Sequence, residues 1–147
     1  MAKGSISAGV FSVAERVQFP LNNPNPSFED LRLIEVVVGG DYNKPDSSLG
    51  TAAFREHGNR SWQPATTPPH GYRSSVAYDP AAKTWITVGP NGTDISTDDG
   101  KNWRPLHPDP ALHEPPDADR NWNALSLPFV VGPKGRIGKL DPEALKR

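Results

Sequence analysis

The sequence predicts an all-β chain built from repeated units of four short antiparallel strands. Turn-forming residues are frequent, with 17 prolines and 13 glycines among 147 residues, and they lie between short apolar runs. Helical periodicity is nearly absent. Similar tracts also recur along the chain, which is the pattern of a repeat architecture.

Short strands separated by turns are clearest between residues 66 and 106. Side chains alternate between two faces in "RSSVAYD" and in "TWITVG", as expected of strands. The "GPNG" segment supplies turn residues, and two further short runs follow, "TDIS" and "WRPL". These runs predict one four-stranded antiparallel unit.

Internal similarity extends this unit to the rest of the chain. The tract "VGPNG" at 88–92 is similar to "VGPKG" at 131–135, an offset of 43, and Val38 precedes Val88 by 50. Upstream, "VFSVA" is similar to "RSSVA". Four-stranded units at such spacings are typical of propeller blades. We therefore predict a partial β-propeller of two to three blades in a single domain, approximately 9–65, 66–106 and 120–140.

Three segments fall outside these blades. Residues 15–35 read as an atypical insertion, although the β-branched residues at the end of "SFEDLRLIEVVV" predict a strand there. Residues 107–119 form a Pro-rich connector. Residues 141–147 predict a short helical tail, with Asp141 as its cap and Pro142 in its first turn.

Composition excludes several classes of function. The net charge is −1 without a basic stripe, so we expect no nucleic-acid partner. No apolar stretch is long enough for a membrane span, and the first residues lack the apolar core of a signal peptide, so we expect a soluble chain. There is no cysteine, and the four histidines lack ligand spacing. We predict no metal site, no cofactor and no catalytic constellation.

The octapeptide "STDDGKNW" at 96–103 predicts a tight hairpin and not a carboxylate dyad. Ser96 and Asp98 can accept hydrogen bonds from turn amides. Gly100 can adopt a positive φ, and Trp103 can bury its ring against a neighbouring sheet. We expect Asp99 to be a solvated turn residue.

The pattern Ser96-x-Asp98-x-Gly100-x-x-Trp103 resembles the Asp box of sialidases and other β-propellers, also called the BNR repeat. Over residues 9–14 and 36–140 the chain resembles the photosystem II assembly factor-like propellers, including "VVVGGDYNKPD", "PPHGYRSSVAYDP" and "DADRNWNALSLPFVVGPKGRIGKL". Only the C-terminal part of those longer propellers is matched. Relatives of this type are often exported, so the compartment stays open.

The resemblance implies that ligands gather at loops entering the innermost strands, here 70–73 and 117–123. Arginine can grip a carboxylate and exposed aromatic rings add contact area. The predicted partner-binding residues are Tyr72, Arg73, Asp119, Arg120, Asn121 and Trp122. In the alternative interpretation, Tyr72 and Trp122 are core residues and the two arginines pair with Asp79, Asp117 or Asp119.

These observations favour a non-enzymatic protein-binding or scaffold module. A sialidase-like glycoside hydrolase relative, using Tyr72, Arg73, Asp119 and Arg120, is the alternative, and an inactive truncated fragment is a third hypothesis. A partial ring would expose two apolar blade faces. Either residues 15–35 cover one face, or two chains pair as a homodimer that completes the ring.

Overall fold

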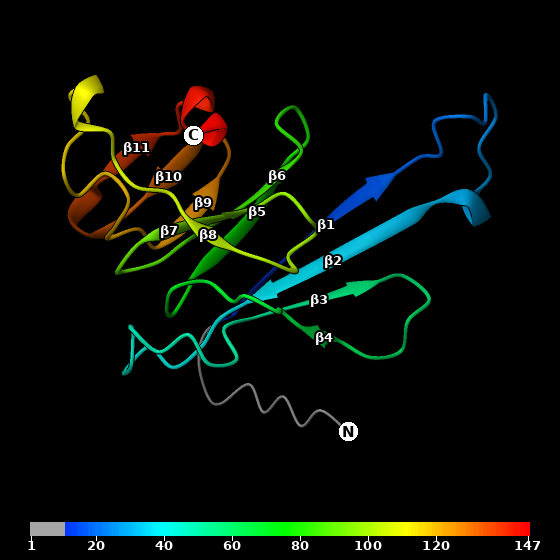
Figure 1. The fold of residues 1–147 in the computed structure, drawn as a ribbon, viewed down its shortest axis with the longest axis horizontal. Helices are drawn as coiled ribbons and strands as arrows, with labels where there is room; N and C mark the ends of the chain where they lie inside the picture. The colour runs from blue at the N-terminus through cyan, green and yellow to red at the C-terminus, as the bar shows by residue number, and fades with distance from the viewer. Residues whose placement is uncertain (1–10) are drawn as a thin grey trace.

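The computed structural model describes residues 11–147 as three antiparallel sheets of four, four and three strands. The sheet β5–β8 lies between the other two, because β5 contacts β1 on one side and β9 on the other (Figure 1). Within the described residues all helical segments are short 3-10 turns, so the predicted all-β class is confirmed.

The first sheet runs in the order β1-β2-β3-β4, the second β5-β6-β7-β8 and the third β11-β10-β9. Their strands are β1 (Ser12–Gln18), β2 (Arg32–Val38), β3 (Ala52–Glu56), β4 (Gln63–Pro64), β5 (Ser75–Asp79), β6 (Thr84–Val88), β7 (Thr93–Ser96), β8 (Arg104–Pro105), β9 (Ala124–Ser126), β10 (Phe129–Val131) and β11 (Ile137–Lys139). The 3-10 turns are η1 (Phe28–Asp30), η2 (Pro110–Leu112), η3 (Pro133–Gly135) and η4 (Pro142–Lys146).

The middle sheet is the meander that the strand pattern predicts. Antiparallel pairing joins β5 to β6, β6 to β7 and β7 to β8. Every residue of β6 is buried, because Trp85 packs toward the first sheet and Ile86 toward the third. A strand that is covered on both faces needs apolar side chains on both, and β6 supplies them.

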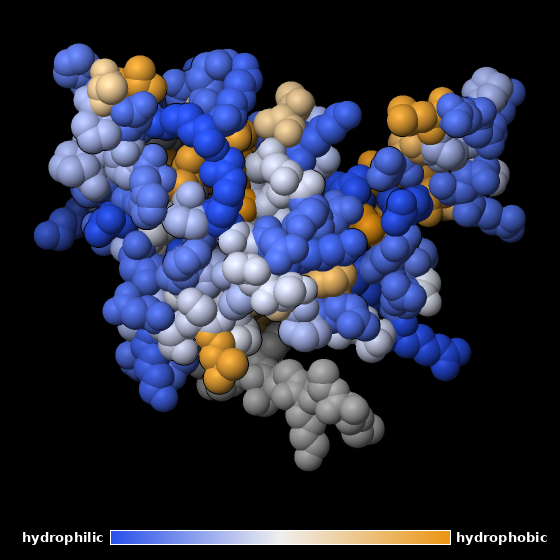
Figure 2. All heavy atoms as spheres, viewed as in Figure 1, coloured by the Kyte–Doolittle hydropathy of each residue, from blue (hydrophilic) through white to orange (hydrophobic). Residues whose placement is uncertain are grey.

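Residues 15–35, predicted as an atypical insertion, take part in regular pairing at both ends. The β1–β2 ladder runs from the pair Ser12 and Val38 to the pair Gln18 and Arg32. The β-branched end of the segment is the strand β2, as predicted. Residues 19–31 form the connection, which projects from the sheets and carries hydrophobic side chains near its end (Figures 1 and 2).

The tail forms the 3-10 helix η4 and covers part of the middle sheet. Its Asp141 side chain accepts a hydrogen bond from the Glu143 amide at 2.9 Å, so the predicted cap is present. Ala144 and Leu145 are buried in one cluster with Ile86, Ile95 and Leu106. The tail therefore packs between the second and third sheets.

A repeated hydrogen bond from a backbone amide to a serine hydroxyl joins successive sheets at their first strands. The Ser12 hydroxyl accepts a hydrogen bond from the Val76 amide at 3.2 Å. The Ser75 hydroxyl likewise accepts one from the Leu125 amide at 3.1 Å. Ser12 and Ser75 occupy equivalent positions in "VFSVA" and "RSSVA", so sequence similarity and spatial equivalence coincide here.

The aligned Val-Gly tracts also occupy equivalent places. Val38, Val88 and Val131 each pair with the first residue of the preceding strand in their own sheet. The next carbonyl then accepts from the loop that enters the following sheet: Gly39 accepts from the Arg73 amide at 3.1 Å, and Gly89 from the Trp122 amide at 3.3 Å. The three sheets are therefore related by one repeated packing step.

Candidate binding site

The hairpin 96–103 is held by its own side chains. The Ser96 hydroxyl accepts from the Gly100 amide at 3.1 Å, and the Asp98 carboxylate accepts from the Asn102 amide at 2.9 Å. Gly100 has a φ of +78°, and the Trp103 indole N–H donates to its carbonyl at 3.0 Å. Trp103 is buried in the core between the first and middle sheets. These contacts give the hairpin a structural role.

Asp99 is not the solvated turn residue that the sequence predicts. Its carboxylate accepts hydrogen bonds from Arg16 Nε at 2.6 Å and Nη2 at 2.7 Å, and from the Trp85 indole at 3.3 Å. Burial acts to raise the pKa of the Asp99 carboxyl, but the hydrogen bonds from Arg16 and Trp85 outweigh it and lower the pKa. The prediction was wrong because the partner comes from another sheet.

Arg73 lies inside the protein and is committed to structural contacts. Its guanidinium is 1% exposed and forms an ion pair with Asp94, through Nε at 2.8 Å and through Nη2. Nη1 donates to the Asn91 side chain at 2.6 Å and to the Tyr72 carbonyl at 2.9 Å. Neither Asp79 nor Asp117 nor Asp119 is its partner, so that expectation is corrected. Tyr72 is buried beside it, and burial raises the pKa of the Tyr72 phenol.

In the loop 117–123, Asp119 and Trp122 are buried whereas Arg120 and Asn121 are exposed. Asp119 accepts a hydrogen bond from Arg120 Nε at 3.1 Å. The Trp122 indole donates to the Ala118 carbonyl at 2.9 Å, and the Arg136 guanidinium lies 4.1 Å from its ring. The burial of Trp122 and the pairing of Arg120 with Asp119 therefore agree with the alternative interpretation, and Asn121 is the predicted contact residue whose side chain is exposed and makes no hydrogen bond within the described residues.

The two predicted loops meet at the turn 89–92. The Asn121 backbone amide donates to the Pro90 carbonyl at 3.0 Å, and the Asn91 side chain donates to the His70 carbonyl at 3.1 Å. The fold thus brings together residues that lie far apart in the sequence. Their side chains are nevertheless mostly engaged in contacts within the protein.

The structure also contains a cleft that the sequence did not predict. It has a volume of about 690 Å³ and lies between the middle and third sheets, bordered by the connector 107–119 and the tail. Its apolar lining includes Ile86, Val88, Leu106, Leu112, Leu125, Val130, Leu140 and Ala144. Figure 2 shows hydrophobic side chains between hydrophilic ones over this part of the molecule.

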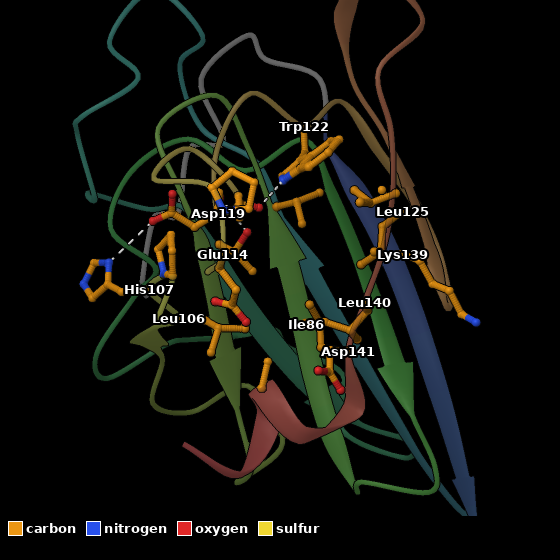
Figure 3. A pocket seen from close by; sticks show the side chains of 18 of the residues that line it. Ile86, Leu106, His107, Glu114, Asp119, Trp122, Leu125, Lys139, Leu140 and Asp141 are labelled. Carbon is orange, nitrogen blue, oxygen red and sulfur yellow. Dashed lines mark hydrogen bonds and ion pairs between the residues drawn. The ribbon is translucent and has the colours of Figure 1, made fainter. Parts of the chain in front are cut away.

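Charged groups surround this apolar lining. Figure 3 shows His107, Glu114 and Asp119 on one side of the cleft and Leu125 and Leu140 on the other. His107 is 70% exposed on its side chain, and its Nδ1 lies 3.4 Å from the Asp119 carboxylate. A hydrogen bond from Arg147 lowers the pKa of the Glu114 carboxyl, so Glu114 is held as an anion. The cleft therefore offers an apolar interior with polar anchors at its edge.

Sequence reasoning missed the cleft because its lining comes from several separate segments between residues 86 and 147. The Pro-rich connector was the available signal, since long irregular loops are frequently functional. Across residues 11–147, no group of three or more histidines, cysteines or carboxylates is placed to hold a metal ion. In the same part of the chain, no helix is long and apolar enough to cross a membrane.

No family model, curated protein or solved structure matches this chain.

Proposed function

We propose that the chain is a non-enzymatic protein-binding module built from the blades of an incomplete Asp-box propeller. The cleft between the middle and third sheets is the site at which it holds an apolar side chain of its partner. The observation that carries this proposal is the apolar lining of the 690 Å³ cleft beside charged edge groups. Ligand sites are commonly concave and apolar, with a few polar groups that fix orientation.

The propeller architecture is supported by the repeated packing step between sheets. Equivalent serine hydroxyls accept amide hydrogen bonds from the following sheet, and equivalent glycine carbonyls accept from its entering loop. Four-stranded antiparallel meanders arranged side by side are the building blocks of propellers. The third sheet has three strands, which leaves room for the tail and the cleft.

The state of Arg73 favours binding over glycoside hydrolysis. A sialidase-like enzyme needs arginines that can reach a substrate carboxylate. The Arg73 guanidinium is 1% exposed and is occupied by Asp94, Asn91 and the Tyr72 carbonyl. Turnover of aryl glycosides by the wild-type chain that is lost in Arg120→Ala would reverse this preference.

The binding proposal is tested with peptides selected from a random display library on the immobilised chain. We expect selected peptides to share a large apolar residue and to bind less tightly, by about 10-fold or more, to Leu112→Glu. Leu112 lines the cleft and is 57% exposed, so its substitution places a charge at the site without disturbing the core.

Leu49→Glu is the matched control, because Leu49 is 92% exposed and lies outside the cleft lining. We expect this control to bind as the wild type does. Equal loss of binding in both variants, or no loss in Leu112→Glu, would contradict the cleft as the binding site.

A further inference from the structure

The third sheet buries one face and leaves the other uncovered. Leu125 and Val130 pack toward the middle sheet. The opposite face, here called the third-sheet outer face, carries Ala124, Ser126, Phe129, Val131, Ile137 and Lys139. Phe129 is 51% exposed, Val131 42% and Ile137 71%. Side chains alternate along strands, so these apolar residues form one surface.

Equivalent positions in the other two sheets are covered. Val131 corresponds to Val38 and Val88, which are 1% and 3% exposed. In both of those sheets the following sheet covers this position. In the first two sheets, this position is apolar and the next sheet packs on it. The third-sheet outer face occupies the same position in its own sheet and is also apolar.

Phe129 shows the same relationship. It corresponds by register to Val36 and Ile86, which are 0% and 1% exposed, whereas Phe129 is half exposed. The positions of Phe129 and Val131 are thus buried in the first two sheets and exposed in the third. All of these residues are apolar, and within residues 11–147 no further sheet lies against Phe129 and Val131.

The first sheet also has an exposed apolar face, on the side that does not contact the middle sheet. Along residues 11–17 its outer face carries Phe11, Val13, Glu15 and Val17, and these three apolar residues are each more than half exposed. Val37 pairs with Val13 on the same face and is 7% exposed, so the exposed part of this face lies along β1. Val13 is 54% exposed, while the equivalent Val76 in the middle sheet is 5% exposed beneath the first sheet. The first-sheet outer face is thus the surface that elsewhere in the molecule contacts a preceding sheet.

The unpaired charges on the two faces have opposite sign, since Glu35 and Arg55, on the same face as Glu15, form an ion pair with each other. Glu15 lies between Val13 and Val17, and Lys139 is paired by register with Phe129. Neither side chain has an ion-pair partner within the described residues. Lys139 borders the cleft, and its side chain extends outward from the other labelled residues in Figure 3. Contact between like faces would oppose like charges, whereas contact between unlike faces brings glutamate toward lysine.

We propose that a second copy of this chain covers both faces, with the third-sheet outer face of each copy on the first-sheet outer face of the other. This proposal rests on the propeller architecture proposed above, since closed propellers contain about four to eight blades. One copy supplies three sheets and two copies supply six, whereas three copies would exceed that range. A head-to-tail contact that closes after two copies saturates every face.

Light scattering of the chromatographed full chain tests the proposal. We expect the wild type at tens of micromolar to have twice the mass of one chain. Val13→Glu and Val131→Glu should each weaken dimerisation by at least about 10-fold, because a carboxylate is buried unpaired at both contacts. Leu21→Glu is the control, as Leu21 is 95% exposed in the projecting connection.

Mixing Val13→Glu with Val131→Lys separates this arrangement from other dimers. Each variant alone buries one unpaired charge at both contacts, whereas the mixed pair has one wild-type contact and one contact that places the new glutamate toward the new lysine, so dimers should reappear in the mixture. A dimer formed by two first-sheet faces would leave Val131→Glu unaffected, and this result would overturn the proposal. A monomeric wild type at these concentrations would also overturn it, and would indicate another covering such as residues 1–10 or a different protein.

Two controls distinguish loss of the contact from misfolding of a variant. Circular dichroism and thermal unfolding establish that each variant is folded. Because the chain has no cysteine, Val13→Cys and Val131→Cys can be mixed, and oxidation should yield the mixed disulfide dimer in preference to like-with-like dimers. Failure to enrich the mixed product would count against the contact even if a glutamate variant misfolds. Ile137 and Lys139 border both the cleft and the third-sheet outer face, whereas Leu112 lines the cleft and is not part of that face. Leu112→Glu should therefore remain dimeric, so cleft binding and dimerisation fail separately.

Discussion

Arg16 and Asp99 are 83 residues apart and form a two-point ion pair that joins β1 to the hairpin of the middle sheet. The same carboxylate accepts the indole N–H of Trp85, whose ring is fully buried between these sheets. The hairpin 96–103 therefore fastens the two sheets together as well as closing its own turn.

The ion pair predicts a specific dependence of stability on pH. The pKa of Asp99 is lowered in the folded state, so its contribution is present above the ordinary carboxyl pKa of about 3.9 and is lost as pH falls through the folded value. Asp99→Asn should be less stable than wild type at pH 7, and the difference should shrink toward pH 3. Urea unfolding at pH 7, 5, 4 and 3 measures it, with the exposed substitution Glu29→Gln as control. A difference that stays constant with pH would disprove the assignment.

Alanine substitutions at Gly100 and Gly135 allow the cost of backbone strain to be measured separately from the cost of steric crowding. Both have a positive φ, +78° and +74°. A Cβ on Gly100 would lie 2.9 Å from Val36 Cγ2, whereas one on Gly135 would have no heavy atom within 4 Å. Gly135→Ala should cost about 1 kcal/mol from strain alone. Gly100→Ala should cost roughly 1 to 3 kcal/mol more because it crowds the core, and equal losses in denaturant unfolding would argue against the tight contact.

Ser96 should stabilise the hairpin through its hydroxyl. Ser96→Ala removes the acceptor of the buried Gly100 amide, which should cost about 1 to 2 kcal/mol of unfolding free energy. Ser61→Ala, in the corresponding hairpin of the first sheet, removes an exposed hydroxyl and should change stability by less than about 0.5 kcal/mol. Amide hydrogen exchange at Gly100 should accelerate only in Ser96→Ala.

The buried pair of Arg73 and Asp94 should be intolerant of losing one partner. Arg73→Met leaves the Asp94 carboxylate inside the protein with its arginine removed, which should cost about 3 to 5 kcal/mol. Adding Asp94→Asn should restore part of this loss, because the uncompensated charge is removed. Arg32→Met breaks an exposed pair with Glu56 and should have little effect on thermal unfolding. If the double variant were no better than the single one, buried charge would not be the cause.

The local parts of this fold could be predicted because their signals are local. Alternating side chains and the turn residues around Pro90 predict the middle sheet, and Gly100 and Trp103 predict its hairpin. The tail was also predicted, since Asp141 and Pro142 are a short-range capping signal. The recurring tracts predicted repeated antiparallel units, and Ser12 and Ser75, which lie in two of these tracts, take equivalent places in the first two sheets.

Features that depend on distant partners could not be predicted in the same way. Asp99 was expected to be solvated because nothing near it in the sequence indicates Arg16. Arg73 was given surface or ion-pair roles, but its partner Asp94 follows only from the fold of loop 70–73 onto β7. The cleft escaped prediction for the same reason, since no single segment carries its lining.

The third sheet differs from the other two in one small chemical detail. Ser12 and Ser75 offer a hydroxyl to the backbone of the next sheet, but the corresponding residue of β9 is Ala124. A sheet that packs on the third sheet at this position would contact the Ala124 methyl group and would lack the hydrogen bond that the serine hydroxyl accepts. This interface would be the weakest of the assembly. Dilution would therefore dissociate the assembly into folded three-sheet chains before any chain unfolded.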